Sequence, residues 1–426
     1  MRDTNEHAPS YYAATRNYSK DYPTLRGEQH ADVVVVGGGF TGVSAALHLV
    51  ERGYSVALIE GNRIGWGASG RNGGQLIDGF VEVDRIEKRF GAGAADIARQ
   101  MGLECRDIVI ELINKHAIDC ELKLGYLDLA LSQSDIDYFH ETVEEKQRTN
   151  YPHECHFVPK AELHNYIGSD IYCGGLVNSG NGHLHPLNLC IGEARAAAEL
   201  GVRIFEQSRV TRIQHGEKPV IETAQGKITA ANIVLAGNAY LGRLEPKLRG
   251  AAIPAGSYVI ATEPLSDDVA TELLPKDMAC CDQRSVLDYF RLSSDKRMLF
   301  GGFCNYSGRD PKDIGASLAP KMHKVFPQLK NARIDFEWGG DIAISVNRIP
   351  QLGRIHGNTY FAQGYSGHGV APTHLAGKVL ADIIAGDSEQ FDVFSKVRHL
   401  RLPGGKFFAN PALALGMMYY RLKDLL

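Results

Sequence analysis

The sequence predicts an α/β protein that opens with a Rossmann-like, dinucleotide-binding unit, and three observations support this prediction. Residues 32–60 run as an apolar stretch, a glycine turn, an amphipathic stretch and a second apolar stretch, the order of a βαβ unit. Residues 358–386 repeat the order of strand, glycine turn and helix. The 426 residues suffice for two or three structural units of roughly 100 to 200 residues each.

The βαβ unit carries the spacing of a dinucleotide site. We expect a buried strand over 32–36, a helix to about residue 52 and a strand over 55–59. Gly37, Gly39 and Gly42 form G-x-G-x-x-G where the first strand meets the helix, which admits a tight turn and a pyrophosphate at the helix N-terminus. Glu60 ends the second strand, where it would accept hydrogen bonds from ribose hydroxyls, which argues against NADP. The pattern fits NAD and FAD alike.

Two further glycine-rich segments are suited to hold the same ligand. Residues 61–76, GNRIGWGASGRNGGQL, contain Arg71 and can lay their backbone against a flat ligand while donating N–H groups. In 358–386 we expect a strand, a glycine turn over 364–370 and a helix that ends before Gly386. The positive end of that helix would stabilise an anionic ring held at the turn.

Composition and charge exclude several classes of protein. The chain has 46 Lys+Arg against 50 Asp+Glu, a net charge of −4, and no basic stripe, so we expect no nucleic-acid partner. No apolar run reaches the roughly 18 to 20 residues of a membrane span. Residues 411–420 are instead expected to form a terminal helix packed on the protein, with a membrane-surface contact as the alternative. The polar N-terminus lacks a secretion pattern, so a cytoplasmic protein is expected.

The cysteines and histidines do not predict a metal site. The eight cysteines include no C-x-x-C pair and are expected to be reduced and mostly buried. The densest group of potential ligands is His153, Cys155 and His156, which lacks a fourth ligand at recognisable spacing. His183 and His185 are interpreted as loop histidines.

Four segments resemble the FAD-contacting parts of the D-amino-acid oxidase and sarcosine oxidase superfamily: DVVVVGGGFTG, GWGASGRNGGQ, the Ala-Gly-Asn of NIVLAGNAY, and AQGYSGHGV. Within that superfamily, SYYAAT, GNGHLHPLNLCIGEA, LDYFRL and RIPQLGR resemble the gamma-glutamylputrescine oxidases of polyamine catabolism. The resemblance spans the whole chain and implies FAD as the cofactor. The residues that it assigns to FAD are Gly37, Gly39, Phe40, Thr41, Gly42, Glu60, Gly67, Ala68, Ser69, Arg71, Asn72, Gly73, Gly74, Val210, Ala236, Gly237, Gly364, Gly367, His368, Gly369 and Val370.

The resemblance also implies a domain organisation. A discontinuous FAD-binding domain of the glutathione-reductase type would comprise residues 31–82, 171–245 and 338–390. An α+β substrate domain with an antiparallel sheet would comprise 83–170 and 246–337, where 120–131 and 286–303 show strand-like alternation. Residues 1–30 would form an N-terminal arm and 391–426 a C-terminal arm or helix. Sarcosine oxidases tether the flavin through a cysteine in the C-terminal third, but no cysteine follows Cys304 here, so non-covalent FAD is expected.

The implied reaction oxidises the terminal primary amine of a γ-glutamylated polyamine with O2, giving an aldehyde, ammonia and hydrogen peroxide. The amine must lose its proton before it is oxidised, and an apolar, aromatic pocket favours the neutral form by desolvation. The aromatic candidates for its wall are Tyr289, Phe290, Phe303, Tyr306, Trp338 and Tyr365. His368 and Tyr365 are the candidate catalytic residues, and Arg291 or Arg348 would bind the glutamyl carboxylate.

Three alternatives stay open at this point. One is another amine or amino-acid oxidase of the superfamily, and a second is a dehydrogenase that passes electrons to a quinone or flavoprotein. The third is a non-catalytic FAD-binding module or a tRNA-modifying flavoprotein, the latter disfavoured by the missing basic stripe. The sequence does not fix the oligomeric state or the preferred polyamine.

Overall fold

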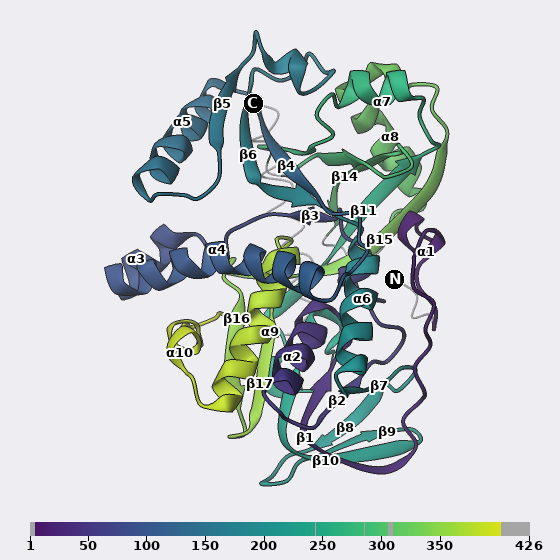
Figure 1. Ribbon diagram of the computed structural model, residues 1–426, viewed down its shortest axis with the longest axis vertical. Coiled ribbons are helices and arrows are strands. Elements are labelled where there is room, and N and C mark those ends of the chain that lie inside the picture. The colour runs from purple at the N-terminus through teal and green to yellow at the C-terminus, as the bar shows by residue number, and fades with distance from the viewer. Residues whose placement is uncertain (1–4, 243, 285, 306–309, 402–426) are drawn as a thin grey trace.

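The computed structural model describes residues 5–242, 244–284, 286–305 and 310–401. Two large sheets lie one above the other in Figure 1, with the first and last parts of the chain meeting in the lower one. Helices cover the lower sheet, and other helices flank the upper one (Figure 1). This arrangement confirms the predicted fold class, an α/β unit joined to a mainly antiparallel sheet.

The lower sheet has the order β16-β17-β10-β1-β2-β7 and is parallel except at the edge strand β16. Strand β1 lies in the middle because its last four residues, 33–36, are fully apolar and buried on both faces. A hairpin, β8–β9, pairs with β10 beside this path. The strands are β1 (Gly27–Val36), β2 (Val56–Ile59), β7 (Arg203–Phe205), β8 (Val210–Gln214), β9 (Val220–Thr223), β10 (Gly226–Leu235), β16 (Gln351–Ile355) and β17 (Thr359–Gln363).

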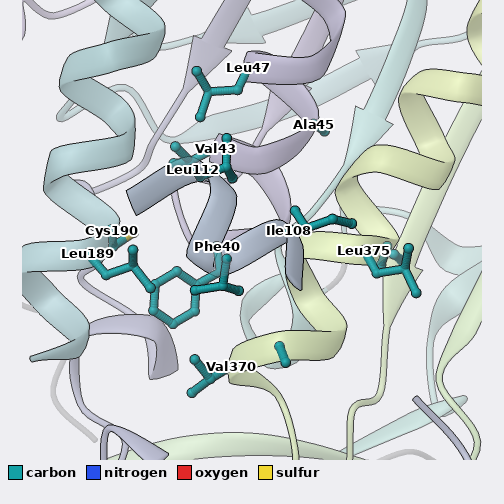
Figure 2. Packing of buried hydrophobic residues seen from close by; sticks show 14 of the residues in the cluster. Phe40, Val43, Ala45, Leu47, Ile108, Leu112, Leu189, Cys190, Val370 and Leu375 are labelled. Carbon is teal, nitrogen blue, oxygen red and sulfur yellow. The ribbon is translucent and has the colours of Figure 1, made fainter. Parts of the chain in front are cut away.

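Helix α2 (Phe40–Glu51) follows β1 and packs against α6 (Pro186–Glu199) and α9 (Val370–Ala385). The crossing with α9 is close, because a Cβ added to Gly377 would lie 2.7 Å from the backbone nitrogen of Ala45. Helix α4 (Ala92–Lys115) packs against α9, and Leu112 from α4 and Val43 from α2 belong to the same hydrophobic core cluster (Figure 2). Helices α3 (Val83–Phe90) and α10 (Glu389–Ser395) lie beside this group (Figure 1).

The upper sheet has the order β15-β11-β14-β13-β12-β4-β6-β3, with β5 paired to β6. It is antiparallel except between β12 and β4. Its strands are β3 (Gln75–Leu76), β4 (Lys123–Ala130), β5 (Cys155–Pro159), β6 (Gly174–His183), β11 (Ala252–Thr262), β12 (Ala279–Asp282), β13 (Tyr289–Leu292), β14 (Met298–Asn305) and β15 (Ile334–Ser345). Helices α5 (Gln133–Arg148), α7 (Asp267–Leu273) and α8 (Ile314–Val325) flank it.

The strand pairing differs in detail from the predicted domain limits, which stay a prediction. Strands β3, β6 and most of β15 pair in the upper sheet, although 31–82, 171–245 and 338–390 were assigned to the FAD domain. Helix α4 falls in the predicted substrate range and packs on α9 of the lower layer. These three segments each run continuously from one sheet to the other, and no linker composition marks the crossing.

The N-terminal arm is anchored rather than loose. Its helix α1 (Tyr11–Ala14) buries Tyr11 and Tyr12 almost completely, and the Tyr12 ring meets Trp338 edge-on at 5.3 Å between centroids. The predicted terminal helix at 411–420 lies outside the described residues. In the described ranges, none of the helices has both the length and the apolar character that crossing a bilayer requires.

Candidate active site

A cavity of about 480 Å³ lies where the two sheets meet. Its wall combines the N-termini of α2 and α9, the 68–77 segment and strands of the upper sheet. The lining residues are Phe40, Ala68, Ser69, Arg71, Asn72, Gly73, Gln75, Ile77, Tyr126, Asn238, Ser257, Cys281, Val286, Leu287, Tyr289, Cys304, Gly340, Ile342, Ala343, Ile344, Arg348, Tyr365, Ser366, Gly367, His368, Gly369, Val370, Ala371 and Thr373.

The turn between β1 and α2 is built so that only glycine fits. Gly37 has φ +116°, a conformation that side chains disfavour, and an added Cβ would lie 2.7 Å from the carbonyl oxygen of Ala236. A Cβ on Gly42 would lie 1.9 Å from the carbonyl oxygen of Gly37. The helix N-terminus is therefore held directly against the end of β1, as a pyrophosphate cradle requires.

Helices α2 and α9 both begin at the cavity wall without a capping side chain. Their N-cap residues are Gly39 and Gly369, which have no side chain to cap the helix. In α2, the N–H of Phe40 donates to Ser69 Oγ at 3.0 Å, which fixes the 68–77 segment beside the turn. Two positive helix ends thus lie next to one cavity, which suits an anionic ligand.

Glu60 lies at the end of β2, next to the glycine turn. Its Oε2 accepts from the N–H of Gly38 at 2.7 Å, and its Oε1 accepts from the N–H of Asn62 at 2.8 Å. Burial raises the pKa of Glu60, although both hydrogen bonds oppose this shift. Each carboxylate oxygen has a second lone pair for a ribose hydroxyl.

The segment around Arg71 is fixed by its own hydrogen bonds. Arg71 Nε donates to the Trp66 carbonyl at 2.7 Å, and its guanidinium lies 4.4 Å from the centre of the Trp66 ring. Asn72 Nδ2 donates to the carbonyls of Ala68 and Ser69. This part of the wall is therefore preformed, with the Arg71 charge facing the cavity.

Not every predicted FAD residue lines the cavity. Gly37, Gly39, Thr41, Gly42, Glu60, Gly67, Ala236, Gly237 and Gly364 lie in the turns at the carboxyl ends of the strands or next to them, whereas Gly74 directly precedes β3 and Val210 begins β8. The close approach of Gly37 to Ala236 joins two of these turns. The turns, the two uncapped helix ends and Glu60 together fit an FAD molecule, whose ring system would reach the cavity.

His368 and Tyr365 both line the cavity from the turn between β17 and α9. His368 Nε2 lies 3.2 Å and 3.1 Å from the carbonyl oxygens of Asp78 and Gly79, so in the neutral ring Nε2 carries the proton and Nδ1 is the acceptor. Desolvation lowers the pKa of His368, which favours that neutral ring. The Tyr365 hydroxyl is 2.8 Å from Thr41 Oγ1, and burial raises its pKa.

The predicted substrate residues divide into two groups. Tyr289 and Arg348 line the cavity. Tyr289 is wedged between two backbones, since a Cβ on Gly73 would lie 2.6 Å from the ring and one on Gly301 2.2 Å from it. Arg348 has an exposed side chain with no hydrogen bond or ion pair to any residue that the structure describes. It is the arginine available to a ligand.

Arg291 and Trp338 are not among the residues that line the cavity, and their assignment to substrate binding stays a prediction. Arg291 is buried and donates to the carbonyls of Gly73 and Leu184 at 2.8 Å and to the Tyr12 hydroxyl at 3.2 Å. Trp338 is buried, and its Nε1 donates to the Arg71 carbonyl at 2.9 Å. Both side chains support the cavity from behind. The backbone of Phe303 belongs to β14, and its side chain is outside the described part.

The charge of the wall is one-sided. Among its described residues are two arginines and one histidine, but no aspartate or glutamate. Such a wall attracts a carboxylate and disfavours a second positive charge, so it lowers the pKa of a bound amine. Burial also raises the pKa of Tyr289 to about 12, which keeps that hydroxyl neutral.

Sequence reasoning missed several wall residues from the upper sheet. Tyr126 on β4 donates to Gln75 Oε1 at 3.2 Å, and Gln75 Nε2 donates to the Cys280 carbonyl at 2.9 Å. Val286 and Leu287 come from the β12–β13 connection, and Ser257 comes from β11. The alternation around Tyr126 predicted a strand, but no local signal shows which face of that strand meets the cavity.

Comparison with known proteins agrees with this site. Residues 32–383 match the family described as DAO, FAD dependent oxidoreductase. The chain is 43% identical over 421 residues to a gamma-glutamylputrescine oxidoreductase of Escherichia coli (strain K12), across 98% of this chain and 99% of that one. It is 42% identical over 425 residues to a probable oxidoreductase, OrdL, of Haemophilus influenzae, across 98% of each chain.

Solved structures show the same fold at lower identity. The glycine oxidase of Geobacillus kaustophilus has a TM-score of 0.73 at 21% identity, over 87% of this chain and 100% of that one. An L-amino acid deaminase of Proteus vulgaris has a TM-score of 0.74 at 18% identity, over 89% and 99%. The resemblance inferred from the motifs is confirmed, and the chain belongs to the DAO family of FAD-dependent oxidoreductases.

Proposed function

We propose that the protein is an FAD-dependent oxidase of γ-glutamylated polyamines, of the γ-glutamylputrescine type. It would convert the terminal amine, O2 and water into an aldehyde, ammonia and hydrogen peroxide. The observation that carries this proposal is one cavity whose wall holds both the cofactor segments and the free guanidinium of Arg348. The name of the relative at 43% identity supports the substrate class.

Arg348 would bind the carboxylate of the glutamyl group. A guanidinium offers two parallel N–H donors to a carboxylate, and this one has no competing partner among the described residues. Its backbone has φ +58°, a left-handed conformation that is uncommon for a residue other than glycine. The apolar parts of Tyr126, Tyr289 and Leu287 would contact the methylene chain of the polyamine.

The cationic wall would keep the reacting amine neutral. When bound, FAD supplies the hydride acceptor and the route of the electrons to O2. The protein contributes position and electrostatics: the wall without carboxylates lowers the pKa of the amine, and Nδ1 of His368 is free to accept a hydrogen bond. His368 is therefore the candidate for a polar contact with the reacting group or the flavin.

FAD would be held without a covalent bond. The cysteines at the cavity are Cys281 and Cys304, and none follows Cys304 in the sequence. Burial raises the pKa of Cys281 well above its ordinary value, which suppresses the thiolate that a covalent bond to the flavin would need.

An anaerobic titration with γ-glutamylputrescine tests the proposal. The flavin absorbance should bleach at one equivalent of substrate and return when air is admitted. N-acetylputrescine is the matched control, because it keeps the amide and the terminal amine but lacks the carboxylate for Arg348. Flavin that stays oxidised with γ-glutamylputrescine would contradict the substrate assignment and leave the family assignment intact.

The electron acceptor is tested in the same preparation. An oxidase should form one hydrogen peroxide per aldehyde in air. Aldehyde formed only after a quinone is added would instead identify a dehydrogenase of the same amine.

A further inference from the structure

A cluster of three side chains lies away from the cavity, near the end of β17 that is opposite the cofactor turn. His215 follows β8, His356 lies in the turn between β16 and β17, and Glu245 precedes the short helix η4 (Pro246–Leu248). The five residues of β17, at about 3.3 Å each, place roughly 16 Å between this turn and the cofactor turn at Gly364. The cluster therefore does not belong to the active site.

The three side chains bring their ligand atoms close together. Glu245 Oε2 lies 3.0 Å from His215 Nε2 and 3.3 Å from His356 Nε2, and all three atoms lie within 4.8 Å of one another. Ligand atoms bound at 2.0–2.2 Å to a tetrahedral metal ion lie about 3.3–3.6 Å apart. The two nitrogen–oxygen distances are close to this value.

The cluster is incomplete as a set of protein groups. The Glu245 side chain is 1% exposed, yet its Oε2 and the Nδ1 of His215 have no hydrogen-bond partner among the described residues. A buried carboxylate oxygen without a donor is costly, and a bound cation would compensate it.

The two imidazole rings stack with their centroids 3.7 Å apart and an angle of 12° between the planes. Two imidazolium ions at this distance would repel each other. A neutral imidazole is the form that binds metal ions. Both rings are about one-quarter exposed, so rotation about χ2 can turn both lone pairs towards one ion.

The backbone around the cluster is fixed before any ion binds. Asn358 Nδ2, two residues after His356, donates to the carbonyls of Gly216 and Glu217, directly after His215. Glu245 Oε1 accepts from the N–H of Lys247 at 2.9 Å, which holds the carboxylate and leaves Oε2 towards the histidines. The ligands come from three segments that are 30 and 111 residues apart in sequence, so no spacing motif predicts them.

We propose that His215, Glu245 and His356 bind a divalent first-row transition-metal ion such as Zn²⁺, with water in the remaining position. Two imidazoles and one carboxylate are ligands that such ions accept, whereas Mg²⁺ and Ca²⁺ prefer oxygen ligands alone. The ion would join the end of β8, the η4 segment and the β16–β17 turn, and thereby stabilise the edge of the lower sheet.

Titration of the tag-free, FAD-loaded protein with Co²⁺ tests this proposal. We expect visible d–d bands of a low-symmetry Co²⁺ site that saturate at one ion per chain and disappear when Zn²⁺ is added. His215→Gln and His356→Asn should each lower the affinity for Co²⁺ by about tenfold or more. Asparagine is chosen at position 356 because it tolerates the positive φ of 51° there. Zn²⁺ should raise the unfolding temperature of the wild type and not that of the two variants.

His156→Gln is the matched control. His156 is also partly exposed and lies 3.0 Å from one carboxylate, that of Glu154, but it belongs to no group of three potential ligands among the residues that the structure describes. Co²⁺ affinity should stay within about twofold in this variant. Absence of saturable Co²⁺ bands in the wild type, or equal affinity in the double variant His215→Gln/His356→Asn with its flavin retained, would overturn the proposal. The flavin titration with amines reads the active site and is independent of this result.

Discussion

Replacement of Gly42 by alanine is the most direct test of the cofactor turn. The added Cβ would lie 1.9 Å from the carbonyl oxygen of Gly37 and 3.2 Å from Cγ1 of Val35. Ordinary contact begins at 3.4 Å, so the start of α2 must move about 1.5 Å away from β1. The obstructing atom belongs to the backbone and cannot rotate away. We expect a loss of about 3 kcal/mol in the free energy of unfolding, at the upper end for overpacked cores.

The same displacement should weaken FAD binding, because the N–H groups of the first turn of α2 would move away from the pyrophosphate. The FAD dissociation constant can be measured from the recovery of flavin fluorescence, and stability from thermal unfolding of the apoprotein.

Gly93→Ala is the matched control. Gly93 is also near the start of a helix, α4, but a Cβ there would meet no atom within 4 Å. Alanine should stabilise that helix by about 0.5–1 kcal/mol, and FAD affinity should not change. The reasoning about the cradle would be refuted if Gly42→Ala matched Gly93→Ala in both unfolding temperature and FAD affinity.

Three further predictions follow from the cavity and the upper sheet. Arg348→Met should raise KM for γ-glutamylputrescine at least tenfold, which corresponds to about 1.4 kcal/mol of lost binding free energy. Arg354→Met, on the exposed face of β16, is the control and should leave KM unchanged. Equal KM values in the two variants would show that Arg348 does not bind the substrate. Acid precipitation should release all the FAD into the supernatant. Flavin left in the precipitate would show a covalent bond, and the variants Cys281→Ser and Cys304→Ser would then locate it. Burial raises the pKa of Asp128 from 3.8 to about 7. Between about pH 4 and pH 7 the folded protein therefore keeps a proton that the unfolded chain loses, so the free energy of unfolding falls as the pH rises through this range. Asp128→Asn should therefore stabilise the protein by roughly 2–4 kcal/mol at pH 8 and have little effect at pH 4. Urea unfolding at both pH values measures this difference. Equal stabilisation at the two pH values would contradict the shifted pKa.

The parts of the fold set by short-range order were predictable from the sequence. The expected strand at 32–36 and helix to about residue 52 are observed as the end of β1 and as α2. Gly37 and Gly42 have the close contacts that their spacing predicted. Gly42 could be interpreted because the backbone that it contacts, at Gly37, is only a few positions away, whereas the contact between Gly37 and Ala236 is long-range in sequence.

The substrate side was less predictable, because contacts far apart in sequence decide it. Arg291 and Arg348 looked equivalent as cations beside aromatic and apolar residues. Arg291 is occupied by Tyr12 and Gly73, which lie 279 and 218 residues away in the chain, whereas Arg348 has no such partner among the described residues. Trp338 was assigned to the pocket by its aromatic character, but Tyr12 covers it from the N-terminal arm. A sequence pattern shows the periodicity of a strand, but it does not show which other part of the chain packs against each face of that strand.

The burial of the N-terminal arm also constrains the order of folding. The Tyr11 hydroxyl donates to Asp295 at 2.8 Å and Tyr12 packs on Trp338, which is synthesised 326 residues later. At roughly 5–20 residues per second, the arm waits about 16 to 65 s on the ribosome before these partners emerge. Tyr11 and Tyr12 are therefore made well before the residues that bury them, and the two tyrosine rings stay available to chaperones or to other nascent chains throughout that interval.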